Sequence, residues 1–149
     1  MIKRGLIPSV ELQPFVDQIW EDVAPAGVQR SDPSTWRDPG DQWEPSVGYH
    51  GNQLRWFGAD SRFWHGALGH DPKFLSATSH HPRMMHMVES LLGGPIRHSN
   101  RNRGVYVVFP RAQPEHKLGA HVDSQSEELL ATVYLDDVGP RDGGFTFWP

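Results

Sequence analysis

The sequence contains no cysteine, so disulfide bonds, thiolate nucleophiles and thiolate metal sites are all excluded. Any metal ion must therefore be held by histidine and carboxylate side chains. The chain has no run of about 18 apolar residues, the length that a membrane-spanning helix needs. Residues 1 to 8 contain too few apolar residues for a secretory signal. These absences predict a soluble, cytoplasmic chain with no membrane partner.

An excess of positive charge is also lacking. The 14 lysine and arginine residues stand against 18 aspartate and glutamate residues, which gives a formal net charge of -4. Because binding to polyanions depends on clustered positive charge, we expect no nucleic-acid partner. The 149 residues, 37% of them hydrophobic, are enough for a single folded domain with its own core.

Proline and glycine set the limits of the expected helices. Pro14, interpreted as a first-turn proline, is followed by apolar residues at helical spacing, which predicts an amphipathic helix over residues 14 to 23. Asp71 and Pro72 predict a short helical turn, and Pro82 predicts a longer helix that ends at a glycine pair. The apolar face of that helix is predicted to hold Met84, Met85, Val88, Leu91 and Leu92.

The remaining segments favour irregular structure first and strands second. Residues 24 to 71 are rich in proline, glycine, aspartate and tryptophan, which predicts long connections with one short strand at residues 53 to 57. After Gly94, short β-branched or aromatic runs separated by turn residues predict a mostly antiparallel sheet. We therefore expect one domain, mainly β with N-terminal helices, with a helical and loop-rich part over 1 to 95 and strands within 96 to 149. The predicted strands are residues 96 to 98, 104 to 110, 129 to 135 and 145 to 148.

His121 and Asp123 form the candidate metal site. Residues two apart on a strand face the same side, so an imidazole nitrogen and a carboxylate oxygen can share one ion. With nine histidines and eleven aspartates, roughly 0.7 such pairs are expected by chance in a chain of this length. The inference therefore depends on the residues around the pair.

Those residues have a recognisable order. A polar stretch at residues 124 to 128 is followed by a predicted strand ending in LDD at residue 137, a glycine-containing turn, and GGFTFWP over residues 143 to 149. This order resembles the iron(II)- and 2-oxoglutarate-dependent dioxygenases, in particular the phytanoyl-CoA dioxygenase-like group and, in the ATVYLDDV portion, the prolyl 4-hydroxylases. The resemblance covers about the last third of the chain.

The resemblance implies a partial double-stranded β-helix, a jelly-roll or cupin-like fold, whose mouth holds Fe(II) through two histidines and one carboxylate. His121 and Asp123 match the first two members of that triad. The implied reaction couples decarboxylation of the cosubstrate 2-oxoglutarate to hydroxylation of a small-molecule or acyl substrate. Three residues on predicted strands are candidates for binding 2-oxoglutarate, with ordinary core or surface positions as the alternative: Tyr106, Thr132 and Tyr134.

Members of the family that this chain resembles continue past the position equivalent to Pro149. They reach a distal histidine and then a basic residue that binds the far carboxylate of 2-oxoglutarate. We therefore expect a fragment without the C-terminal strands of the β-helix, inactive alone, whose open sheet edges lead to a homo-oligomer. His116 or a second chain is a candidate for the third metal ligand. The alternative function is a non-catalytic cupin-like binding or assembly module, in which His121 and Asp123 only hydrogen-bond loops.

The other histidines suggest packing and capping. The five-residue step from His81 to His86 does not place two imidazoles on one helical face, so a metal cluster with His80 is not predicted. We interpret these residues as helix caps or solvent-facing side chains. The basic run Arg97, Arg101 and Arg103 fits either a solvated loop or an anionic substrate.

Overall fold

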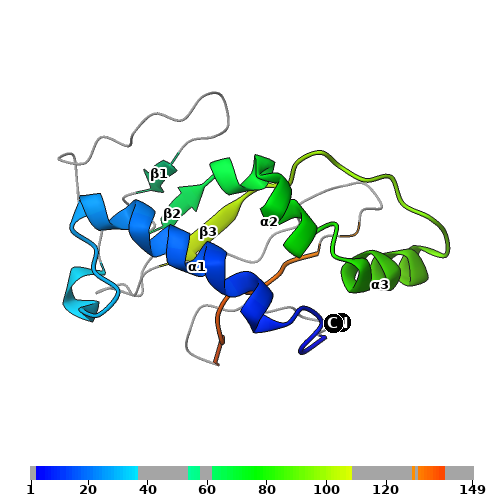
Figure 1. Ribbon diagram of the computed structural model, residues 1–149, viewed down its shortest axis with the longest axis horizontal. Coiled ribbons are helices and arrows are strands. Elements are labelled where there is room, and N and C mark those ends of the chain that lie inside the picture. The colour runs from blue at the N-terminus through cyan, green and yellow to red at the C-terminus, as the bar shows by residue number, and fades with distance from the viewer. Residues whose placement is uncertain (1–2, 37–53, 58–61, 109–128, 130, 140–149) are drawn as a thin grey trace.

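The computed structural model describes residues 3–36, 54–57, 62–108, 129 and 131–139 (Figure 1). Within these ranges the chain forms three α-helices, three short 3-10 helices and three strands of four residues each. The elements are α1 (Ser9–Val23), the 3-10 turns Ala24–Ala26, Pro33–Thr35 and Ala67–His70, α2 (Pro72–Ala77), α3 (Pro82–Leu92), β1 (Leu54–Phe57), β2 (Arg62–His65) and β3 (Val105–Val108).

The expected mainly β fold is wrong. Helices outweigh strands among the described residues, and the three short strands there form no jelly roll or partial double-stranded β-helix. Residues 96 to 98 form no strand, and neither do the described residues between 129 and 135. Strand 104 to 110 is confirmed in part as β3 and strand 53 to 57 as β1, whereas β2 was not predicted. Residues 145 to 148 lie outside the described part of the chain.

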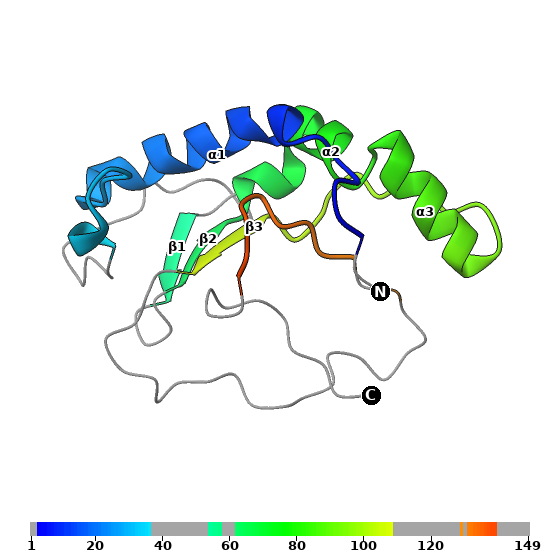
Figure 2. The same ribbon diagram turned by 90° about the horizontal axis from the view of Figure 1, so that it is seen from below.

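The three strands form one antiparallel sheet in the order β1-β2-β3. Across it, His65 of β2 lies opposite Leu54 on one side and Val105 on the other. Helices α1 and α2 lie on one side of this sheet, and α3 lies beyond α2, away from the strands (Figure 2). The sheet face that α1 and α2 cover therefore forms one side of the hydrophobic core.

Helix α1 begins five residues before the sequence predicts, so Pro14 lies inside the helix and not in its first turn. Pro8 is the N-cap, and its carbonyl accepts a hydrogen bond from the Glu11 amide at 3.0 Å. An interior proline removes the hydrogen bond to the carbonyl four residues earlier, which here belongs to Val10. Both Pro14 and Val10 are exposed, so water can satisfy that carbonyl. The solvent-facing position therefore makes the interior proline tolerable.

Helices α2 and α3 begin at the prolines that the sequence indicates, and α3 ends at the predicted glycine pair. The Asp71 carboxylate accepts hydrogen bonds from the Lys73 and Phe74 amides at 2.7 and 2.9 Å, which caps α2. Pro82 occupies the first turn of α3, and the helix ends at Gly93. The predicted apolar face is only partly correct. Met84, Met85 and Val88 are buried, but Leu91 and Leu92 are more than half exposed.

The core consists of three neighbouring clusters. The first joins α1 to α3 through Leu12, Met84 and Val88, and the second joins α1, α2 and β3 through Ile19, Phe74 and Val105. The third lies at the end of α1, where Val23 packs on Val28. Partly buried residues complete the clusters: Leu6, Phe15, Trp20, Ala26, Trp36, Met87, Ile96, Val107, Val133 and Leu135.

Among the described residues no helix is long and apolar enough to cross a membrane.

A tight backbone junction connects the sheet to the 3-10 turn Ala67–His70. The Asn102 amide donates to the Gly69 carbonyl at 2.8 Å, and the Asn102 side-chain oxygen accepts from the Gly104 amide at 2.8 Å. Gly104 has a φ of +78°, and a Cβ there would lie 2.4 Å from the His65 carbonyl oxygen. Only glycine fits this approach without a shift of the backbone.

Candidate functional site

The predicted metal ligands His121 and Asp123 lie outside the described residues, as does His116. The described chain reaches this segment at Val108, the last residue of β3, and resumes at Leu129. The pairing of the imidazole and the carboxylate on one ion therefore stays a prediction.

Both flanks of the segment that contains His121 are packed on the core. On one side, Val105 is buried against α1 and α2, and Val107 packs against the third cluster. On the other side, Val133 and Leu135 pack against the cluster between α1 and α3. The segment that contains His121 and Asp123 is therefore flanked on both sides by described residues that pack against the helices.

The predicted 2-oxoglutarate contacts do not share an element. Tyr106 lies on β3, is 49% exposed, and its ring stacks on Trp64 with centroids 6.4 Å apart. Thr132 and Tyr134 are exposed on a segment that forms no strand. The two are outward positions that alternate with the inward Val133 and Leu135. All three hydroxyl groups are therefore on exposed residues.

His65 is a buried polar residue that the sequence did not single out as functional. Its Nδ1 accepts a hydrogen bond from the Leu68 amide at 3.3 Å, so the proton of the neutral ring resides on Nε2. That nitrogen donates to the Asp22 carboxylate at 2.6 Å. Both ring nitrogens are used, so His65 joins the end of β2 to the last turn of α1. No local signal in the sequence reveals this pair, because 43 residues separate its members.

His81 makes an equivalent connection at the other end of α1. Its Nδ1 accepts from the Arg83 amide at 3.2 Å, which makes His81 the N-cap of α3 and confirms its interpretation as a helix cap. Its Nε2 lies 3.3 Å from the Glu11 carboxylate, in the first turn of α1. Helix α1 is therefore tied at both ends by a histidine whose tautomer is fixed by a backbone amide.

A third pair of residues comes close together between α2, α3 and β3. The rings of His80 and His98 lie with centroids 5.0 Å apart and planes tilted by 53°. The Nε2 atom of His80 is 2.6 Å from the Ser99 carbonyl oxygen. Within the described ranges, no group of three histidine or acidic side chains is arranged to hold a metal. His80 and His98 therefore form a pair of neighbouring imidazoles, without a third histidine or acidic side chain from the described residues.

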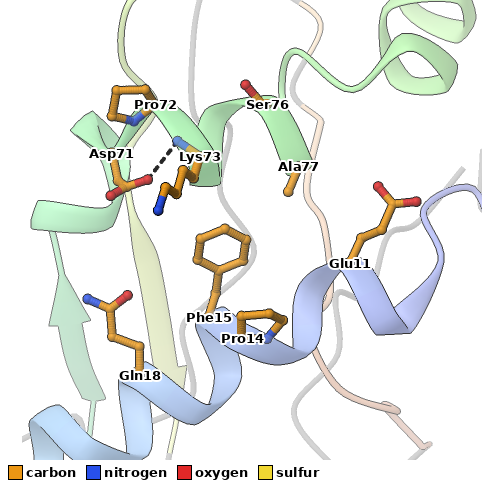
Figure 3. A pocket seen from close by; sticks show the side chains of 9 residues that line it. All are labelled: Glu11, Pro14, Phe15, Gln18, Asp71, Pro72, Lys73, Ser76 and Ala77. Atoms are coloured by element: carbon orange, nitrogen blue, oxygen red, sulfur yellow. Dashed lines mark hydrogen bonds between the residues drawn. The ribbon is translucent and has the colours of Figure 1, made fainter.

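A shallow groove of about 770 Å³ lies between α1 and α2 (Figure 3). The Phe15 ring extends from α1 toward α2, beside Lys73, and the Asp71 carboxylate points back to the α2 amides that it caps. Because Glu11 is engaged by His81 and Asp71 by α2, these carboxylates are not available as a converging acid and base pair. The lining residues are Glu11, Pro14, Phe15, Gln18, Asp71, Pro72, Lys73, Ser76 and Ala77.

Among the described residues, Asp17 has a carboxyl group whose pKa the structure clearly lowers. Hydrogen bonds from the Gln13 amide and the Arg30 guanidinium, each 2.7 Å long, hold the pKa of the Asp17 carboxyl below its ordinary value. Its stabilising contribution is therefore present above the ordinary carboxyl pKa and is lost as the pH falls through the lowered value. The ion pair between Asp17 and Arg30 links α1 to the segment that follows it. Both side chains are exposed to solvent, so the pair does not form an enclosed catalytic arrangement.

Comparison of the chain with protein-family models, with curated proteins and with solved structures gives no match. The function is therefore argued from the residues of this chain alone. Two arrangements are available for that purpose: the His121 and Asp123 motif in the sequence, and the histidine pairs that the fold brings together.

Proposed function

We propose that this chain is part of a non-haem iron(II)- and 2-oxoglutarate-dependent oxygenase that hydroxylates a small-molecule or acyl substrate. The observation that carries the proposal is the His121-x-Asp123 motif and the order of the residues that follow it to Pro149. The described residues on either side, Val105 and Val107 of β3 and Val133 and Leu135, pack against the core. The motif itself lies outside the described, mainly helical part of the chain.

The donor set fits the metal. A neutral imidazole nitrogen and a carboxylate oxygen are ligands that suit divalent iron, and the other positions stay open for water and for 2-oxoglutarate. When bound, the iron and 2-oxoglutarate supply the oxidation of the substrate C–H bond. His121 and Asp123 hold and orient the ion. The hydroxyls of Tyr106, Thr132 and Tyr134 remain the predicted contacts of the 2-oxoglutarate carboxylate.

An anaerobic titration tests the proposal. Iron(II) and 2-oxoglutarate are added to the protein, and the charge-transfer absorption band of the ternary complex is recorded. Because only two protein ligands are assigned, we expect weak binding, so that the band grows until iron is in excess. His121→Ala and Asp123→Ala should each weaken iron binding at least about tenfold, since loss of even an outer-shell partner costs roughly 10- to 100-fold. His86→Ala, which removes an exposed histidine of α3, is the matched control and should leave the titration unchanged.

The variants decide between the two candidate functions. A band that survives both ligand substitutions contradicts the assignment of His121 and Asp123. Folded protein that binds neither iron nor 2-oxoglutarate at millimolar concentrations contradicts the oxygenase function and favours the non-catalytic binding module.

We also propose that the chain acts in the cytoplasm as a homo-oligomer. The outer edges of β1 and β3 have no strand partner among the described residues, and open edges are sites at which two sheets can join. We expect sedimentation velocity to show a dimer or larger species that dissociates on dilution. A single compact monomer at all concentrations would contradict the oligomer.

A further inference from the structure

His80 and His98 come from segments that are distant in the sequence. His80 follows α2, and its amide donates to the Leu75 carbonyl at 2.8 Å, which fixes its backbone at the end of that helix. His98 lies in the connection between α3 and β3 and is exposed. The fold nevertheless places the two rings 5.0 Å apart.

The hydrogen bond of His80 determines which nitrogen is available. A backbone carbonyl can only accept, so the 2.6 Å contact with the Ser99 oxygen requires a proton on Nε2. In the neutral ring the lone pair is then on Nδ1. Among the described residues nothing hydrogen-bonds this Nδ1 atom. Metal-binding histidines almost always have this arrangement, in which the other ring nitrogen donates to a carbonyl or a carboxylate.

We propose that Nδ1 of His80 and a ring nitrogen of His98 form a two-imidazole site for a divalent transition-metal ion of the zinc class. Zinc binds histidine nitrogen at 2.0–2.1 Å, so two nitrogens on one tetrahedral ion lie roughly 3.3 Å apart. Rings whose centroids are 5.0 Å apart reach this separation by rotation of the exposed His98 side chain. Water completes the coordination. The site uses other ligands than the proposed His121 and Asp123 site.

The environment limits both the choice of ion and the affinity. Imidazole suits zinc, copper and nickel, whereas magnesium, calcium and manganese prefer oxygen ligands. Arg97 is next to His98 in the sequence and adds positive charge. Among the described residues no acidic side chain joins the two histidines to offset the charge of a bound ion. We therefore expect moderate affinity.

Binding would also have a mechanical consequence. The ion would link the turn between α2 and α3 to the connection that leads into β3, two segments that the Ser99 carbonyl already joins through His80. A ligand that binds only the folded state raises its stability in proportion to the logarithm of ligand concentration. Zinc should therefore raise the unfolding temperature as well as bind.

The experiment uses the full chain with His121→Ala and Asp123→Ala already introduced, so that the other proposed metal site is absent. Zinc chloride is titrated calorimetrically at 150 mM salt, and the unfolding temperature is measured with and without zinc. We expect one zinc per chain. His98→Gln and His80→Gln should each weaken binding at least about tenfold, the range in which single coordination partners act. His86→Gln and His70→Gln remove exposed histidines elsewhere and should have no effect.

Each outcome is decisive. Equal zinc affinity in the parent and in His98→Gln overturns the site, and so does the absence of zinc binding in the folded parent. His98 is exposed, so its substitution tests the site even where His80→Gln disturbs folding. Nitrogen NMR should show zinc on Nδ1 of His80, and coordination through Nε2 would overturn the proposed geometry. Because the parent already lacks His121 and Asp123, these results are independent of the oxygenase proposal.

Discussion

Replacing Gly104 with alanine is expected to lower the free energy of unfolding by about 3 kcal/mol or more. Two costs add at this position. A left-handed conformation costs a residue with a Cβ about 1 to 2 kcal/mol, and Gly104 has a φ of +78°. The new Cβ would also lie 2.4 Å from the His65 carbonyl and 3.0 Å from the Gly66 Cα, so the backbone itself must move. Overpacking of this kind costs about 1 to 3 kcal/mol.

Gly27→Ala separates the two costs. Gly27 has nearly the same φ, +80°, but a Cβ there would meet nothing within 4 Å. Its substitution should cost only the conformational part, about 1 to 2 kcal/mol. Equilibrium unfolding in urea measures both values. Equal destabilisation by the two substitutions would show that the close approach of Gly104 to His65 does not occur.

His65→Ala is expected to destabilise the protein by about 3 kcal/mol. The substitution removes a buried ring and leaves the Leu68 amide and the Asp22 carboxylate without their partner. The buried Leu68 amide would lose its acceptor, which costs about 1 to 3 kcal/mol, whereas the Asp22 side chain is 33% exposed and can bind water. His70→Ala, at an exposed position five residues later, is the control and should change the free energy of unfolding by less than about 0.5 kcal/mol.

A double-mutant cycle with Asp22→Asn isolates the contact between the two side chains. The loss caused by His65→Ala should be smaller in the Asp22→Asn background, because the carboxylate has already been removed. His65→Asn should recover part of the stability, since its side-chain oxygen can replace Nδ1 as the acceptor for Leu68. Full additivity of the two substitutions would contradict the 2.6 Å interaction.

The sequence predicted the elements whose limits are set by local chemistry. Helix α2 begins at the Asp71 cap, and α3 runs between a proline and a glycine, so a few adjacent residues specify each. Strands β1 and β3 were also found from short apolar or aromatic runs. These features depend on the backbone and its nearest neighbours, which a sequence displays directly.

The prediction of a strand at residues 129 to 135 is wrong for the described residues, because periodicity reports burial and not hydrogen bonding. Residues 132 to 135 do alternate, with Val133 and Leu135 packed inward and Thr132 and Tyr134 exposed. A strand, however, needs a partner at the right distance, and the alternation alone cannot supply one. The same limit explains why β2 was missed, since its pairing with β1 and β3 is a property of the tertiary fold.

The candidate sites show the same division. The His121 and Asp123 motif is visible in the sequence because its members are two residues apart. The contacts of His65 with Asp22 and of His80 with His98 span 43 and 18 positions, so only the fold brings them together. His80 and His81, which their spacing along one helix did not predict as metal ligands, thus contact side chains from other segments.

That His121 and Asp123 bind one metal ion is tested most directly by paramagnetic broadening. Manganese(II), which binds the carboxylate oxygen of a mixed histidine and aspartate site and tolerates air, is added in substoichiometric amounts to isotopically labelled protein. We predict that the ring signals of His121 and the backbone signals around Asp123 broaden first, and that Asp123→Ala abolishes this broadening. Broadening that begins elsewhere, or that is unchanged in the variant, would contradict the shared ion.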